Sequence, residues 1–170
     1  NYKGRLKFAK IAKKAGVKRY IFNSTCSVYG FNKKTVFENS KKNPLSSYAK
    51  ANLKAEIEIF KIKSQNFKVN VLRNSTLFGF SSTLRLDLVI NIFVYNLLKN
   101  KKIYVDGNGE QYRPFISIID ICNIYKNIIK EEKMPSFISN VVAFNSDIKK
   151  LAFKICSILK KDKKLINFNS

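Results

Sequence analysis

The first part of the chain alternates between helical and strand patterns, and this alternation limits the folds that it can adopt. Residues 3–15 space apolar side chains at helical intervals, and Gly16 ends that pattern. Residues 19–22 form a short apolar strand, residues 48–63 a long amphipathic helix, and residues 68–73 an alternating strand. Strands that are joined by helices run parallel to one another. The order therefore predicts an α/β fold with a parallel sheet covered by helices.

The segments between and after these elements are less regular. Residues 23–27 form a predicted polar turn, residues 31–46 a loop, and Ser46 and Ser47 are candidate caps for the helix that follows. Beyond Arg73 the expected order is a loop at 74–83, a helix at 84–99, a strand at 102–105, a turn at 106–109, a strand at 112–116, a helix to about residue 130 capped by Asp120, a strand at 141–144 and a helix at 147–160. The lysine-rich tail after residue 160 is expected to fray.

The charge of the chain is unusual, but its makeup does not favour a nucleic-acid reader. The 170 residues, enough for one compact domain, carry a formal net charge of +22. Only five of the 33 basic residues are Arg, at positions 5, 19, 73, 85 and 113. Nucleic-acid readers use Arg heavily, because its guanidinium contacts phosphate and guanine through two hydrogen bonds. The lysine surplus therefore favours a coding bias over a specific nucleic-acid partner, and a basic nucleic-acid-binding module is the weakest alternative.

Several kinds of chemistry are excluded by composition. The three cysteines are far apart in apolar runs, which predicts neither disulfides nor a zinc cluster and indicates a reducing, cytoplasmic compartment. The sequence has no His, so any proton transfer falls to Tyr, Lys, Asp, Glu or a hydroxyl. We expect no metal site. The most apolar stretch, residues 86–98, is too short to span a bilayer, so no membrane partner is expected.

Three segments could carry chemistry beyond packing. Hydroxyl side chains at 24–27 directly follow a predicted strand, where parallel sheets bind ligands, although Ser and Thr also simply form turns. Tyr48 begins a helix whose first turns contain Lys50 and Asn52; nearby positive charge suits a proton carrier, and the alternative is a packing Tyr. In the segment 107–115, a glycine turn leads to Arg113, which is a candidate clamp for a diphosphate.

Taken in order, these segments resemble a known family. The motifs are Ser24-Thr25-Cys26-Ser27-Val28-Tyr29-Gly30, then Tyr48 at a helix start, Val71-Leu72-Arg73, and Gln111-Tyr112-Arg113-Pro114-Phe115-Ile116 with Asp120. They resemble the extended short-chain dehydrogenase/reductase family, and within it the NAD-dependent epimerases and dehydratases of nucleotide sugars, typified by UDP-glucose 4-epimerase. The resemblance implies a partial Rossmann-like parallel sheet with helices plus a small α+β substrate-binding portion. Residues 1–76 would be the C-terminal half of the NAD-binding domain, completed by later strand and helix segments, and residues 77–170 mainly the substrate-binding portion.

The resemblance also implies roles for individual residues. Thr25 and Tyr48 take the catalytic positions, where a hydroxyl binds the sugar oxygen and a tyrosine exchanges its proton. Ser24, Tyr48, Asn52, Asn74 and Ser75 take the positions that contact the cofactor NAD, with NADP as the open alternative. The implied contacts to a nucleotide-sugar substrate come from Thr25, Ser27, Thr76 and Arg113. A homodimer through the helix that begins at Tyr48 is the implied assembly.

Three departures from the family pattern bear on activity. Cys26 and Ser27 stand where the dehydratases carry Asp and Glu, which disfavours elimination of water because that reaction needs a carboxylic acid and a base. Asn52 stands where the family has a Lys that holds the nicotinamide ribose and favours the ionised tyrosine; an amide supplies no charge. The glycine-rich phosphate loop is absent, which indicates N-terminal truncation. A non-catalytic relative that still binds a nucleotide sugar is therefore the alternative to an epimerase-like enzyme.

Overall fold

The structure is a computed structural model that describes residues 2–32 and 34–169, and it divides into two compact units. Unit 1 comprises residues 1–75 and 124–141, and unit 2 comprises residues 76–123 and 142–170. Among the described residues, no helix is long and apolar enough to cross a membrane.

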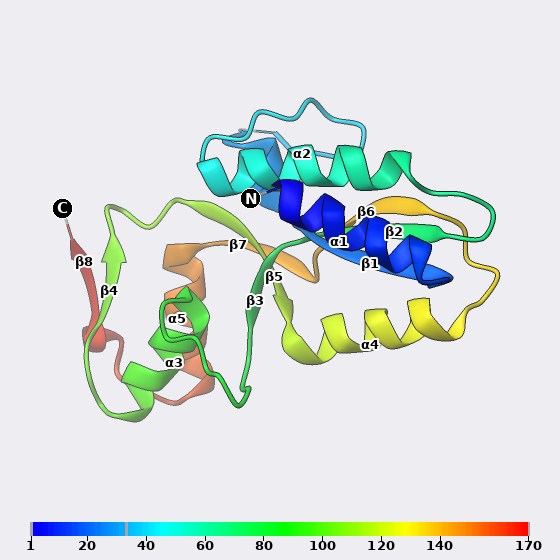
Figure 1. Cartoon of the computed structure of the whole chain (residues 1–170). Coiled ribbons are helices and arrows are strands. Elements are labelled where there is room, and N and C mark those ends of the chain that lie inside the picture. The colour runs from blue at the N-terminus through cyan, green and yellow to red at the C-terminus, as the bar shows by residue number, and fades with distance from the viewer. Residues whose placement is uncertain (1, 33, 170) are drawn as a thin grey trace. The chain divides into compact units, whose positions relative to one another are not determined.

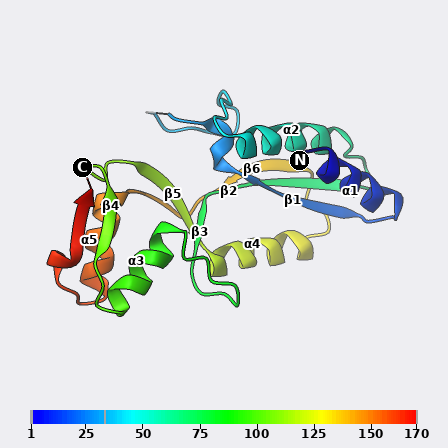
Figure 2. The same ribbon diagram turned by 60° about the vertical axis from the view of Figure 1, so that its left-hand side comes forward.

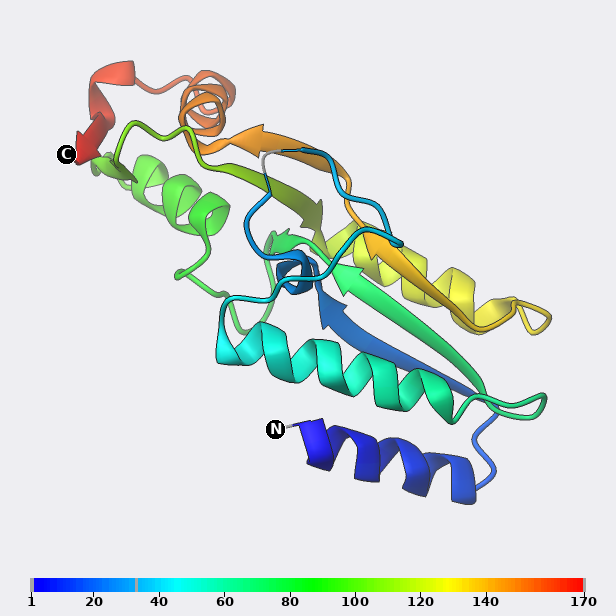
Figure 3. The same cartoon turned by 90° about the horizontal axis from the view of Figure 1, so that it is seen from above.

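Unit 1 is built on a parallel three-stranded sheet, as the sequence predicts. Its strands are β1 (Arg19–Thr25), β2 (Lys68–Asn74) and β6 (Phe137–Val141), in the order β1-β2-β6. The helices α1 (Tyr2–Lys14) and α2 (Ser47–Lys61) lie side by side on one face of this sheet, and α4 (Ile118–Lys130) lies on the other (Figures 1 and 3). The α/β fold with a parallel sheet is thereby confirmed.

The core of unit 1 explains why the two helices share one face of the sheet. Ala9 of α1 and Ala55 of α2 are fully buried, and their small side chains let the two helices approach the strands closely. Ile59, Phe67 and Val69 fill the remaining space. The apolar side chains of β1 and β2 thus pack against α1 and α2 on this face of the sheet. Polar side chains follow at the carboxyl ends of the two strands.

The loop between β1 and α2 is tied back to unit 1. It begins with η1 (Cys26–Tyr29), a short 3₁₀ helix that ends at Gly30. Gly30 has a φ of +67°, and a Cβ there would lie 2.0 Å from the carbonyl oxygen of Asn43, so only glycine fits. The backbone N–H of Asn43 in turn donates to the carbonyl of Val28 at 3.0 Å. The loop therefore packs against η1 where it turns back.

The described part of unit 2 contains two small sheets, the helices α3 (Val89–Leu98) and α5 (Ile148–Ile158), and the first residues of α4. Strands β3 (Thr76–Phe78), β5 (Tyr112–Ser117) and β7 (Phe144–Asp147) form the first sheet, in which β5 pairs parallel with β3 and antiparallel with β7. Strand β4 (Ile103–Asp106) pairs parallel with β8 (Ile166–Asn169). Helices α3 and α5 pack beside them, and η2 (Lys163–Leu165) precedes β8 (Figure 2).

Several details of the sequence prediction are wrong. Strand β3 lies within the expected loop at 74–83, the helix expected from residue 84 begins only at Val89, and the strand expected at 141–144 is instead the end of β6 and the start of β7. The tail after residue 160 does not fray, because residues 166–169 form β8 and pair with β4. The expected polar turn at 23–27 is partly strand, since β1 continues to Thr25. The segment 137–141 is a strand that the sequence prediction missed, and its polar residues explain the omission. Asp120 does not cap α4: Ser117 does, accepting from the Asp120 backbone N–H at 3.1 Å while its hydroxyl donates to the Asp120 carboxylate.

Candidate functional site

The polar residues of interest lie at the carboxyl ends of two neighbouring parallel strands. In the β1–β2 register, Ser24 pairs with Arg73 and Thr25 pairs with Asn74. Ser75 follows immediately, and its backbone N–H donates to the carbonyl of Val141 on β6 at 3.0 Å. We call this edge, formed by Ser24, Thr25, Asn74 and Ser75, the polar edge. Ligands of open parallel sheets bind at this end of the strands.

Thr25 is positioned by the helical turn that it starts. Its hydroxyl oxygen accepts from the backbone N–H of Ser27 at 3.1 Å, as a cap of η1 does, and donates to the Ser27 hydroxyl at 3.2 Å. Thr25 is buried, whereas Ser27 is exposed. The two hydroxyls that the sequence analysis assigned to the substrate are thus brought together, and the Thr25 hydroxyl points along a direction that its neighbour fixes.

Three polar atoms of the polar edge lack partners among the described residues. They are the hydroxyl oxygens of Ser24 and Ser75 and the side-chain carbonyl oxygen of Asn74. An unpaired buried polar atom costs on the order of 1–3 kcal/mol of stability, so such atoms are rare unless something binds them. Three of them on adjacent strand ends fit the hydroxyl and amide groups of a polar ligand. The residues present therefore suit the nicotinamide and ribose groups of a dinucleotide.

The orientation of Asn74 is fixed by its neighbours. Its amide nitrogen lies 3.4 Å from both the Asn23 carbonyl oxygen and the Tyr125 hydroxyl, while that hydroxyl donates to Asn23 at 2.6 Å. Tyr125 belongs to the part of α4 that lies in unit 1. Because the amide nitrogen faces this pair, the unpaired oxygen of Asn74 is directed elsewhere, and it is this oxygen that remains for a ligand.

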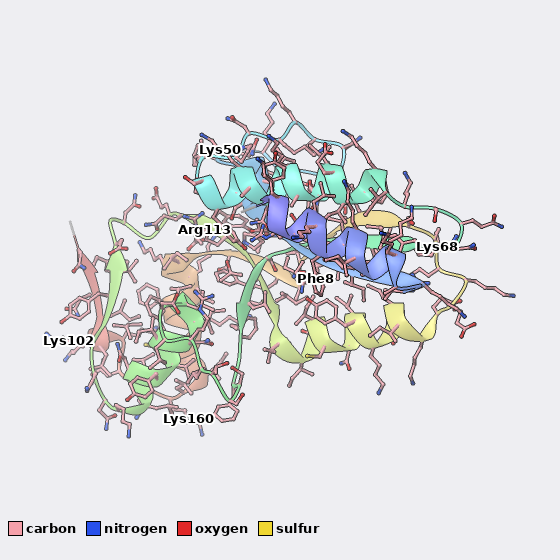
Figure 4. The ribbon with its side chains drawn as sticks, viewed as in Figure 1. Phe8, Lys50, Lys68, Lys102, Arg113 and Lys160 are labelled. Carbon is pink, nitrogen blue, oxygen red and sulfur yellow. The ribbon has the colours of Figure 1, made fainter. Side chains whose placement is uncertain are left out.

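Tyr48 lies in the first turn of α2 and is accessible. The helix is capped by Ser46, whose hydroxyl oxygen accepts from the Ala49 backbone N–H at 3.1 Å. The Tyr48 side chain is 58% exposed, so its phenol can meet a substrate without any rearrangement of the core. Lys50 lies on the same first turns of α2 and is exposed (Figure 4). The sequence prediction of a helix beginning next to Tyr48 is confirmed.

Asn52 is held from two sides, by contacts that the sequence analysis did not foresee. It is 1% exposed, and its amide nitrogen donates to the Tyr48 backbone carbonyl at 2.9 Å. Its carbonyl oxygen accepts from the guanidinium of Arg5 on α1 at 2.8 Å. Both ends of the amide are therefore engaged inside unit 1, and a cation lies beside the position that the family pattern reserves for one.

Cys26 stands in the motif where the dehydratases have a carboxylate, and its chemistry is different. Its thiol donates to the backbone carbonyl of Arg73 at 3.0 Å. Burial raises the pKa of the Cys26 thiol to about 11, and the positive charge of Arg73 only partly opposes this shift. Cys26 is therefore an uncharged thiol at neutral pH and cannot act as the carboxylic acid of an elimination.

A buried ion pair that the sequence analysis missed lies beneath the polar edge. The Arg73 guanidinium donates to the Glu56 carboxylate at 2.6 Å, with both side chains at most 3% exposed. Arg73 also donates to the Tyr29 hydroxyl at 2.7 Å and to the Glu38 backbone carbonyl at 3.0 Å. A lone acidic residue on the buried face of α2 was the available signal for this pair. The network joins β2, α2, η1 and the loop, so it is a scaffold for the polar edge.

Two of the predicted substrate residues belong to unit 2. Thr76 begins β3, where it pairs with Phe115 of β5, and Arg113 lies on β5 opposite Ser146 of β7. Arg113 is exposed, and its guanidinium makes no hydrogen bond or ion pair within residues 2–32 and 34–169 (Figure 4). It is thus accessible to an anionic group. Over the same residues no cluster of potential metal ligands is found.

The chain matches a family model and several named proteins. The model of the NAD dependent epimerase/dehydratase family matches residues 1–141. Human dTDP-D-glucose 4,6-dehydratase is 30% identical over 152 residues, which are 88% of this chain and 43% of that protein. An uncharacterized UDP-glucose epimerase of Bacillus subtilis is 28% identical over 145 residues, or 84% of this chain and 44% of that protein.

Solved structures show the same fold. The dTDP-glucose 4,6-dehydratase of Bacillus anthracis, in complex with NAD, aligns with a TM-score of 0.82 and 23% identity over 98% of this chain and 54% of that one. The UDP-N-acetylglucosamine 4-epimerase of Methanobrevibacter ruminantium aligns with a TM-score of 0.80 and 26% identity over 96% and 53%. The chain therefore spans about half the length of the proteins that it matches.

Proposed function

Because the chain belongs to the NAD-dependent epimerase/dehydratase family, we propose that it supplies the catalytic and substrate side of a nucleotide-sugar epimerase that uses NAD. The observation that carries this proposal is the set of unpaired buried polar atoms at Ser24, Asn74 and Ser75, next to the fixed hydroxyl of Thr25. Such a set suits a dinucleotide and a sugar that bind together at the polar edge.

The proposed roles come from the family resemblance and are supported by the exposure and hydrogen bonding of each side chain. NAD, when bound, accepts a hydride from a sugar carbon and returns it. Ser24, Asn74 and Ser75 bind the nicotinamide end through their unpaired atoms. Thr25 and Ser27 bind the sugar hydroxyl that loses its proton, and the accessible phenol oxygen of Tyr48 exchanges that proton. Thr76 contacts the sugar, and Arg113 binds the diphosphate through its accessible guanidinium.

Epimerisation is preferred to dehydration on the chemistry of the motif. The two positions that follow Thr25 are Cys26 and Ser27, which carry no carboxylate. The high pKa of the Cys26 thiol keeps it neutral. Elimination of water from the sugar needs both an acid and a base at these positions, whereas reversible hydride transfer needs only the Tyr48 proton carrier. The similarity to proteins named as dehydratases therefore supports membership of the family, but it does not support dehydration as the reaction of this chain.

A second candidate is a non-catalytic protein that binds a nucleotide sugar. Position 52 favours this alternative, because its buried amide carries no charge and is already hydrogen-bonded inside unit 1. A homodimer through α2 is proposed as well, and it would use the exposed apolar side chains of Ile57 on α2 and of Phe8 and Ile11 on α1. NAD is proposed as the cofactor, with NADP as the competing ligand in the same assay.

The intact gene product tests the proposal when it is assayed with UDP-glucose and dTDP-glucose in the presence of NAD. We expect a 4-epimeric sugar nucleotide, detected by proton NMR, and loss of at least about a hundredfold in rate for Tyr48→Phe, which removes the proton carrier. Tyr104→Phe is the matched control, because Tyr104 is similarly exposed at 56% but lies on β4 of unit 2. Formation of a 4-keto-6-deoxy sugar would indicate dehydration instead, and a protein that binds neither NAD nor sugar nucleotide would overturn the proposal.

A further inference from the structure

The contact between Arg5 and Asn52 has features of a site and not only of helix packing. Arg5 lies on α1, 47 positions before Asn52, and its guanidinium donates one hydrogen bond to the buried Asn52 carbonyl oxygen at 2.8 Å. A guanidinium has five N–H donors. Within residues 2–32 and 34–169, the remaining donors of Arg5 have no acceptor, although the side chain is half-buried. Unit 1 thus holds an oriented cation with spare donors.

The neighbours of Arg5 fix where this charge lies. The guanidinium carbon is 6.0 Å from the ring centre of Phe22 on β1, two residues before Ser24 of the polar edge. On its other side, Asn52 connects Arg5 to the backbone carbonyl of Tyr48 at 2.9 Å. An aromatic face and an amide oxygen therefore orient the guanidinium between β1 and the first turns of α2. Tyr48, at the start of those turns, is the proposed proton carrier.

The chemistry of the proposed reaction gives such a cation a use. A tyrosine that takes and returns a proton passes through a phenolate, and a nearby positive charge stabilises that anion. The ribose hydroxyls of a dinucleotide also accept hydrogen bonds from charged donors. The uncharged amide at position 52 can neither stabilise a phenolate by its charge nor donate a charged hydrogen bond to the ribose. The Asn52 side-chain oxygen bonds the Arg5 guanidinium at 2.8 Å. A lysine at position 52 would carry its charge on an atom two bonds further from the backbone than this oxygen.

We propose that Arg5 is the cation of the cofactor and proton-transfer site, and that Asn52 is the residue that positions it. This inference rests on the proposed function, because it assigns a residue to that same site. The positive charge is contributed by α1 and not by α2. The contribution of α2 is Asn52, which holds the Arg5 guanidinium in place. In this chain, which has asparagine at position 52, the cation would therefore come from Arg5 on α1.

The chain contains a matched pair with which a purely structural role can be separated. Arg19, at the start of β1, donates to the Asn70 side-chain oxygen on β2, also at 2.8 Å and also partly buried, but its other terminal nitrogen bonds the backbone carbonyls of residues 131, 132 and 134 and is not spare. This pair lies at the amino ends of the strands, at the opposite end of the sheet from the polar edge. If Arg5 only joined two elements, then Arg5→Ala and Arg19→Ala would have the same consequences for ligand binding.

The experiment measures NADH affinity by fluorescence and thermal unfolding in the intact gene product. Arg5→Ala is expected to weaken NADH binding by on the order of tenfold, the size of one lost charged hydrogen bond, while Arg19→Ala lowers the melting temperature and leaves the affinity unchanged. Arg5→Gln keeps a donor for Asn52 but removes the charge, so we expect it to fold like the wild type and to bind NADH as weakly as Arg5→Ala. This variant keeps the test valid even if Arg5→Ala unfolds.

Rescue by moving the charge completes the test. Asn52→Lys alone places a second cation beside Arg5 and is expected to lower the melting temperature, because like charges repel at short range. The double variant Arg5→Ala with Asn52→Lys returns one cation to the site and is expected to recover NADH affinity to within about threefold of wild type. Equal affinities for wild type, Arg5→Ala and Arg5→Gln, or no recovery in the double variant, would overturn the inference alone. A wild-type protein without NADH affinity would overturn the proposed function, and this inference with it.

Discussion

The two units differ in what they bury. Every buried polar or charged side chain among the described residues belongs to unit 1: Ser24, Thr25, Asn52, Glu56, Asn70, Arg73 and Ser75. The buried residues of unit 2 are apolar side chains and Gly109. Polar groups are costly to bury unless they are paired, and among the described residues unit 1 alone bears this cost. Unit 2 presents its candidate binding group, Arg113, on the surface instead.

The largest expected effect comes from breaking the buried Arg73–Glu56 ion pair of unit 1. Arg73→Ala leaves the Glu56 carboxylate buried without its partner, and we expect the free energy of unfolding to fall by about 3–5 kcal/mol. Urea unfolding measures this loss. The matched control is Arg85→Ala in unit 2, where Arg85 and Asp87 form an ion pair with both side chains more than 60% exposed. There we expect a change below about 1 kcal/mol, and equal losses for both variants would contradict the contrast.

The apolar core of unit 2 is the next target. Leu97 is fully buried on α3 among Ile103, Leu151 and other apolar side chains. Leu97→Ala is expected to cost about 3 kcal/mol, since it removes buried methyl groups and leaves a cavity. Because this core holds no polar ligand group, NADH affinity at a temperature where the variant is folded should not change. A loss of affinity as large as that of a polar-edge variant would show that the division of roles between the units is wrong.

Two serines of unit 1 sharpen the comparison within that unit. The hydroxyl of Ser75 is buried without a partner, so Ser75→Ala is expected to leave the unliganded protein unchanged or more stable by up to about 1 kcal/mol. The hydroxyl of Ser46 caps α2, so Ser46→Ala is expected to cost about 1 kcal/mol. Thermal unfolding of the two variants side by side gives the signs. A destabilising Ser75→Ala would mean that its hydroxyl is satisfied within the protein and is not reserved for a ligand.

The smallest expected effect is a dependence on pH at the loop of unit 1. The Glu38 carboxylate accepts the Asn140 backbone N–H at 2.8 Å, and this bond lowers the pKa of Glu38 below its ordinary value. The contribution to stability is therefore complete above the unfolded value and is lost as the pH falls through the folded value. Because Glu38 is exposed, solvent screening keeps it well under about 1 kcal/mol. Glu38→Gln should flatten the acid side of a stability profile measured from pH 6 to pH 3, and an unchanged profile would contradict this.

The sequence was a good guide where periodicity is strong and local. The helix near residues 48–63 and the strand at 68–73 were predicted within a few residues, because amphipathic spacing and alternation come directly from burial on one face. The strand β8 was missed because the lysines around it resemble a solvated tail, and only pairing with β4 makes it regular. Strand formation in such a short segment depends on its partner and not on its own residues.

The candidate site shows the same limit more sharply. The hydroxyls at Ser24 and Thr25 could be placed at a strand end, since the strand preceding them was recognisable. The partner of Asn52 could not be found, because Arg5 lies 47 residues away and meets it only once α1 and α2 pack together. Glu56 and Arg73, 17 residues apart, are likewise joined by the folding of a helix onto a strand. Contacts between elements carry no periodic signal in one sequence.

The ties on the loop between η1 and α2 have a consequence for motion. Arg73 holds the Glu38 carbonyl, the Asn140 backbone holds the Glu38 carboxylate, and Asn43 is bonded to Val28 beside Gly30. A segment fastened at several points along its length opens only when these bonds break together, which makes opening slow and rare. The segment from Glu38 to Asn43 is therefore held against the rest of unit 1. The amide hydrogens of Asn43 and Asn140, both hydrogen-bonded, are therefore expected to exchange with solvent more slowly than those of unbonded loop residues.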